Sequence, residues 1–154
     1  MNYSDLTISN KNLIKRLSHS KRFEIASKLI EKYNPDTYLD YGTGDGELIK
    51  CLLNKKKKKI YLFEPNEIMR ANLKLNLINY QNEIIKIFKK DSEVFENFFD
   101  LISINEVFEH LTNESCIETF KILKKIGKKN VKLIISVPIE IGVASLFKNF
   151  IRIM

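Results

Sequence analysis

The chain has few of the residues that build metal centres or disulfide frameworks. Its 154 residues include two cysteines, two histidines and no tryptophan. Cys51 and Cys116 lie far apart in segments that are predicted to be helical, so neither a disulfide framework nor a metal site is indicated. No run approaches the roughly 20 apolar residues of a membrane span. The polar stretch Met1–Asn10 lacks the apolar core of a signal peptide. These absences predict one cytoplasmic domain that covers residues 1–154.

The chain has fewer acidic than basic residues. The chain has 26 lysines and arginines against 19 aspartates and glutamates, which gives a net charge of +7. A nucleic-acid partner is one interpretation of such an excess. Much of the excess, however, comes from the consecutive lysines Lys55–Lys59, which have no interleaved aromatic residue. Such a run is more typical of a solvated loop, so an RNA partner is the less favoured hypothesis.

Glycine is also scarce, and three of the five glycines stand at alternate positions, Gly42, Gly44 and Gly46. They follow an apolar segment that contains Asp40. Glycine permits positive φ and close approach of a ligand to the backbone, and the start of a following helix offers free N–H groups. The spacing G-x-G-x-G differs from the dinucleotide fingerprint G-x-G-x-x-G. A carboxylate at Asp40 also suits a cationic ligand group better than a pyrophosphate.

Strand patterns alternate with helix patterns along the chain. Strands are predicted over residues 37–41, 59–64, 84–88, 99–104 and 131–137. Helices are predicted over residues 20–33, 48–53, 66–75 and 113–126, with a short one near 13–17 and a last amphipathic segment over 143–154. This alternation predicts a parallel sheet with helices on both faces. The carboxyl ends of its strands share one rim, where ligands bind.

Three segments carry a resemblance to a known family. The glycine turn Thr37–Leu48 resembles motif I of the class I S-adenosylmethionine-dependent methyltransferases. Phe99–Leu111 resembles motif IV of their small-molecule branch, and Ser136–Gly142 resembles the end of the fifth strand in that branch. The resemblance implies a Rossmann-like three-layer α/β/α sandwich and S-adenosylmethionine as cofactor. It also implies methyl transfer to a small-molecule acceptor, such as a sugar or a lipid-linked precursor, and because the sequence shows no cluster of metal ligands, we expect this transfer to be metal-independent.

The resemblance also implies roles for acidic residues at three strand ends. Asp40 would lie near the methionine end of the cofactor, Glu64 would accept hydrogen bonds from both ribose hydroxyls, and Asp91 would accept one from the adenine amino group. Carboxylates are acceptors and each of these ligand groups is a donor. The full predicted cofactor-binding set is Asp40, Gly42, Thr43, Gly44, Gly46, Glu64, Pro65, Met69, Asp91, Ser92, Asn105 and Glu106. The alternatives are that Asp91 caps the segment that begins at Ser92 and that Met69 belongs to the core.

The catalytic candidates are His110, Glu106 and Glu109. Histidine titrates near neutral pH and could act as a general base, although a packing or capping role is the favoured alternative for His110. Residues 105–108 read Asn-Glu-Val-Phe. They lack the two prolines found there in relatives that methylate amino groups of adenine or glutamine, which counts against those acceptors.

The family's sheet has seven strands, of which the last two form an antiparallel hairpin, and this chain ends after the segment that follows the fifth strand. We therefore expect the C-terminal hairpin to be lacking. The edge of strand 131–137 and the apolar segment 143–154 are expected to mediate dimerisation or partner binding. Because Lys148 and Arg152 lie among the apolar residues, contact with a membrane surface is a weaker alternative. A catalytically incomplete domain that binds the cofactor, or a partner subunit, is the second hypothesis for the function.

Overall fold

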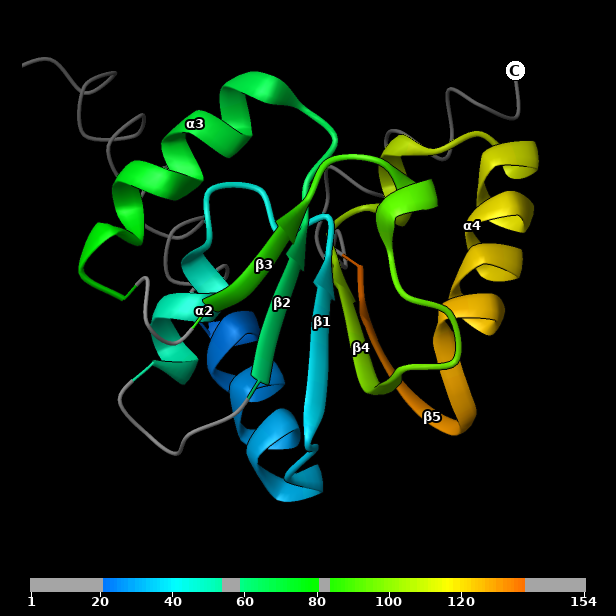
Figure 1. Cartoon of the computed structure of the whole chain (residues 1–154), viewed down its shortest axis with the longest axis horizontal. Coiled ribbons are helices and arrows are strands. Elements are labelled where there is room, and N and C mark those ends of the chain that lie inside the picture. The colour runs from blue at the N-terminus through cyan, green and yellow to red at the C-terminus, as the bar shows by residue number, and fades with distance from the viewer. Residues whose placement is uncertain (1–20, 54–58, 81–83, 138–154) are drawn as a thin grey trace, which may run out of the picture.

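The described residues form one parallel sheet with helices on both faces (Figure 1). The structure is a computed structural model that describes residues 21–53, 59–80 and 84–137. Its five strands lie in the order β3-β2-β1-β4-β5, and every pairing is parallel. Their bounds are β1 (Thr37–Tyr41), β2 (Lys59–Phe63), β3 (Ile84–Phe88), β4 (Phe99–Asn105) and β5 (Gly127–Ser136). The predicted Rossmann-like α/β/α sandwich is confirmed.

Helices connect the strands. One helix covers residues 21–33, and the others are α2 (Glu47–Leu52), α3 (Glu67–Asn76) and α4 (Asn113–Ile126). Short 3-10 turns are η1 (Ile78–Tyr80), η2 (Asp91–Glu93) and η3 (Phe108–His110). Side chains cap two of the helices, since Asn66 accepts a hydrogen bond from the backbone N–H of Met69 and Thr112 accepts one from that of Ser115. No helix in the described parts of the chain is both long and apolar enough to cross a membrane.

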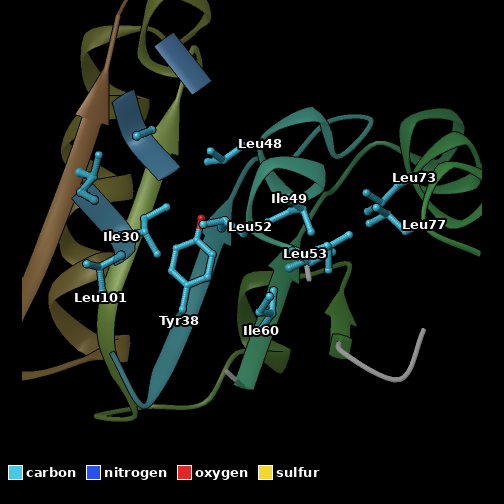
Figure 2. Packing of buried hydrophobic residues seen from close by; sticks show 13 residues of the cluster. Ile30, Tyr38, Leu48, Ile49, Leu52, Leu53, Ile60, Leu73, Leu77 and Leu101 are labelled. Carbon is cyan, nitrogen blue, oxygen red and sulfur yellow. The ribbon is translucent and has the colours of Figure 1, made fainter. Parts of the chain in front are cut away.

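The sheet has a separate apolar core on each face, because successive strand residues point to opposite sides. Tyr38 and Leu39 of β1 illustrate this, since they belong to different cores. The first core lies under the helix at residues 21–33, α2 and α3, and Figure 2 shows Ile30, Leu52 and Leu101 near the ring of Tyr38, with Leu73 of α3 and Leu77 at the other end of this core. The second lies under α4 and is rich in aromatic residues, namely Tyr41, Tyr61, Phe63, Phe88 and Phe99.

The predicted elements agree with the structure within about two residues except for the last strand. β5 begins at Gly127, directly after α4, whereas the pattern predicted a start at Val131. Gly127 pairs with Phe99, and the next pair is Leu101 with Lys132. The register therefore shifts between these pairs, and residues 128–131 of β5 form an irregularity in the strand. Because residues 128–130 are polar and do not alternate with apolar residues, the sequence pattern did not predict a strand there.

The predicted short helix near residues 13–17 and the amphipathic segment 143–154 lie outside the described residues, as does any strand after β5. Leu133 and Ile135 of β5 are 40% and 44% exposed. The expected association through this edge stays a prediction.

The turn between β1 and α2 is built from glycines in the left-handed region. Gly44 has φ 59° and Gly46 has φ 87°, which L-residues with a side chain rarely adopt. Their surroundings differ. A Cβ on Gly46 would lie 2.7 Å from Leu73 Cδ1 of α3, whereas a Cβ on Gly44 would meet no atom within 4 Å. Gly46 therefore allows α3 to pack against the turn, and the backbone at Gly44 is open.

This difference predicts unequal costs for two matched substitutions. Gly46→Ala should lower the free energy of unfolding by about 2–4 kcal/mol, since a left-handed backbone and overpacking against α3 both disfavour it. Gly44→Ala should cost only about 1–2 kcal/mol, from the backbone alone. Urea denaturation of both variants and the wild type measures the two values. Equal losses would contradict the packing role of Gly46.

Candidate functional site

The candidate site lies on the rim formed by the carboxyl ends of β1, β2 and β4, the usual ligand position in a parallel sheet. The glycine turn follows β1, Glu64 follows β2, and Asn105 ends β4. The strand register places Asp40 beside Leu62 on one side and Ser103 on the other. The topology therefore brings the residues predicted from separate motifs to one place.

Asp40 is a buried carboxylate at the base of the turn. It is 2% exposed, accepts a hydrogen bond from the Ser103 hydroxyl, and has the amide nitrogen of Asn105 at 3.5 Å. Burial raises the pKa of Asp40, and the hydrogen bonds, led by that from Ser103, offset this only in part. The Thr43 hydroxyl also stabilises the charged form, yet it is buried with no hydrogen-bond partner of ordinary geometry among the described residues. A buried carboxyl group with a raised pKa therefore lies beneath the turn.

Glu64 ties the turn to the start of α3. Glu64 is 4% exposed. Its two carboxylate oxygens accept hydrogen bonds from different backbone N–H groups. Oε2 accepts from Gly44 at 2.8 Å, and Oε1 accepts from Asn66 at 2.9 Å. A carboxylate has about four acceptor positions. Each oxygen of Glu64 therefore keeps capacity for a further donor, such as a ligand hydroxyl.

Arg70 of α3 holds the backbone on which Glu64 stands. Its Nη1 donates to the carbonyl oxygens of Glu64 at 2.8 Å and Pro65 at 2.5 Å. The sequence analysis missed this residue, because nothing in the sequence links it to the preceding loop. Beside it, Pro65 is exposed. Met69 is 48% exposed, so the alternative that it belongs to the core is wrong.

Asp91 begins η2 next to the end of β3. The Tyr41 hydroxyl donates to its Oδ1 at 2.6 Å, and the Tyr41 ring stacks on Phe63 with the ring centroids 4.3 Å apart. Burial, together with the hydrogen bond to Asp91, raises the pKa of Tyr41 far above its usual value, so the hydroxyl remains a donor. The capping alternative for Asp91 is wrong, because Lys90 occupies the N-cap position. The Asp91 and Ser92 side chains are exposed.

The segment after β4 places Glu106 and Val107 against the turn. Glu106 has φ 56°, and its Oε1 lies 2.5 Å from Nη2 of Arg22 in the helix at residues 21–33. Val107 covers Gly42, where any Cβ would collide with its side chain. Asn105 accepts a hydrogen bond from the Ser136 hydroxyl at 2.9 Å, which connects β5 to the site.

Among the catalytic candidates, Glu106 is partly buried and paired with Arg22, whereas Glu109 and His110 are exposed on η3. The backbone N–H of His110 donates to the carbonyl of Val107 at 3.0 Å. Within the described ranges, no group of three or more potential metal ligands comes together.

Comparison with protein families gives a match to a model described as a methyltransferase domain, over residues 12–151. A search of curated proteins gives no match.

Solved structures share the fold. The methyltransferase domain of a bacterial Hen1 protein is 20% identical with a TM-score of 0.65, and the match covers 78% of this chain and 66% of that one. A candidate S-adenosyl-L-methionine-dependent methyltransferase from Methanococcus maripaludis is 18% identical with a TM-score of 0.68, covering 94% and 69%. The glycopeptide N-methyltransferase MtfA, complexed with sinefungin, is 13% identical with a TM-score of 0.64, covering 77% and 54%. The chain therefore spans about two thirds of the first two structures and about half of the third.

The buried Asp40 charge predicts a pH effect on stability. Because its pKa is raised in the folded state, the folded protein binds this proton more tightly than the unfolded chain does. Its contribution to stability is then full below the unfolded pKa of about 3.9 and is lost as pH rises through the folded value. Asp40→Asn should remove this dependence and raise the melting temperature at pH 7.

The matched control is Asp45→Asn, which removes the same charge from an exposed position in the same turn and should leave the pH profile unchanged. Melting curves between pH 4 and pH 8 provide the measurement. A melting temperature of the Asp40→Asn variant below that of the wild type at pH 7 would show that the charge stabilises the fold.

Proposed function

The chain belongs to the methyltransferase domain family, and from this premise we propose that it transfers a methyl group from S-adenosylmethionine to a small-molecule acceptor. The family and the sinefungin-bound neighbour imply S-adenosylmethionine as the donor. This cofactor supplies a methyl group on a positively charged sulfur, which makes transfer to oxygen, nitrogen or carbon an in-line displacement.

One observation carries the proposal: the Glu64 carboxylate, buried at 4% exposure, bridges Gly44 and Asn66 beside an open stretch of backbone. A buried charge is costly unless it is hydrogen-bonded, and two backbone N–H groups meet that need here. The remaining acceptor positions fit two vicinal hydroxyls of a ribose. Because Gly44 has no Cβ, a ligand can approach its backbone closely.

The other acidic residues fit the two ends of the same ligand. Asp40 supplies negative charge where the cofactor carries a cationic ammonium group. Asp91, held by Tyr41 through one oxygen, keeps its other oxygen for an amino donor such as that of adenine. Pro65 and Met69 are exposed beside Glu64 and suit contact with an apolar ring.

Catalysis at this site would rest on positioning. Holding an acceptor in line with the methyl group can account for much of the barrier reduction in such a transfer, and a base is needed only when the acceptor must lose a proton early. Glu106 is engaged with Arg22. We therefore assign acceptor contact or proton removal to the exposed Glu109 and His110.

A small-molecule acceptor, such as a sugar or a lipid-linked precursor, is supported by the sequence Asn105–Phe108, which lacks the two prolines of relatives that methylate adenine or glutamine. The net charge of +7 favours RNA as a second candidate acceptor.

Calorimetry with S-adenosylmethionine tests the cofactor. We expect the wild type to bind it and not to bind NAD. Gly44→Arg should abolish binding, because a long side chain would fill the open space above the turn, whereas Gly44→Ala should bind with at most a moderate loss. Absence of binding by the folded wild type would refute the proposal.

Transfer of a labelled methyl group to a panel of small acceptors, and to RNA, tests the acceptor. Incorporation into a small molecule without a shift of RNA mobility at low salt is expected. A salt-sensitive RNA shift with methylated RNA would favour the second candidate, and tight cofactor binding without any transfer would indicate an incomplete domain or a partner subunit.

A further inference from the structure

Arg22 is a cation at the rim, and the proposed function assigns no ligand group to it. It stands on the helix at residues 21–33, and its Nη2 lies 2.5 Å from Glu106 Oε1. The two side chains are 22% and 18% exposed. The pair is therefore mostly shielded from water, where charge interactions are stronger than on an open surface.

The guanidinium is only partly satisfied. Its Nε is buried and has no hydrogen-bond partner among the described residues. A guanidinium has five N–H donors in a fixed plane, and a buried donor without an acceptor destabilises the fold. Nε and a neighbouring Nη together form a fork that matches the two oxygens of a carboxylate.

A short series of contacts connects this fork to the glycine turn. Glu106, the partner of Arg22, directly follows Asn105, whose amide reaches toward Asp40 at 3.5 Å. Val107, the next residue, covers Gly42. These contacts link Arg22 to the Asp40 side of the site.

The backbone of Glu106 is held in an unusual conformation. Its φ of 56° is disfavoured for a residue with a side chain by about 1–2 kcal/mol. Its N–H donates to the Ser136 carbonyl at 3.0 Å, which helps fix it. Such strain persists where the surrounding structure enforces it, often at ligand sites. Here the strained residue is the one whose carboxylate pairs with Arg22.

The cofactor's amino-acid end carries both an ammonium and a carboxylate. Asp40 suits the ammonium, and the carboxylate needs a cation. Lys50, the basic residue of α2 just after the glycine turn, is paired with Glu47 at 2.6 Å. We propose that Arg22 binds the α-carboxylate of S-adenosylmethionine through Nε and one Nη, with Glu106 holding the guanidinium in place. This inference rests on the proposed function.

The test compares S-adenosylmethionine with its decarboxylated form, which keeps the nucleoside, the sulfonium and the amino group. In calorimetry, the wild type should bind S-adenosylmethionine at least about tenfold more tightly than the decarboxylated form, as expected for charge-assisted hydrogen bonds. In Arg22→Met this ratio should fall to within about twofold. Lys21→Met removes the charge of an exposed neighbour on the same helix and should keep the wild-type ratio.

Arg22→Lys is the second variant, because it keeps the charge but offers no planar fork, and its ratio should lie between those of the wild type and Arg22→Met. Melting curves establish that each variant is folded. A wild type that binds both ligands equally, or a folded Arg22→Met or Arg22→Lys variant that keeps the full ratio, would overturn the assignment while leaving the proposed function intact. A folded wild type that binds neither ligand would overturn both.

Discussion

The site depends on one buried carboxylate. Glu64 accepts hydrogen bonds from Gly44 in the turn after β1 and from Asn66 at the start of α3. Because β1 and β2 are adjacent and parallel, with Tyr41 opposite Phe63, the two loops leave the sheet side by side and a single side chain can join them. The glycine turn is thus held in a fixed shape before a ligand arrives. A site fixed in this way loses less conformational entropy on binding.

Two features of the rim oppose folding. Asp40 is a buried carboxyl group whose pKa is raised by burial, and Glu106 has a left-handed backbone. Each is unfavourable by itself, and they lie near the end of β1 and directly after β4. The apolar cores on the two faces of the sheet, together with the parallel pairings, provide the stability that tolerates them. This separation of a strained rim from a well-packed body is the usual compromise between stability and function.

The sequence was sufficient for most of the fold and for the acidic residues of the rim. Short apolar segments marked β1 to β4, with glycine or proline beside the first two of them, and topology then placed Asp40, Glu64 and Asp91 on one rim whatever their neighbours. The side-chain pairs were not predictable in this way. Tyr41 with Asp91, Arg70 with the Glu64 carbonyl and Arg22 with Glu106 join distant elements. Such pairs depend on distances that only the assembled sheet sets, and the early start of β5 likewise depends on its pairing with β4.

The two ends of the site are built from different parts of the molecule. The Glu64 and Asp91 end is supported by β1, β2 and the first turn of α3, which are joined by the Glu64 carboxylate and by backbone hydrogen bonds from Gly42 and Thr43 to the Phe63 carbonyl. At the Asp40 end, the supports are the segment after β4, the end of β5 and the helix at residues 21–33, which meet through side chains of Arg22, Asn105 and Ser136. Backbone contacts survive most substitutions, whereas side-chain contacts change with a single residue. The backbone link between the glycine turn and the end of β2 is therefore the more robust feature of this rim, although its bridge to α3 still requires the Glu64 carboxylate, and the Asp40 end is the part that substitutions can tune most easily.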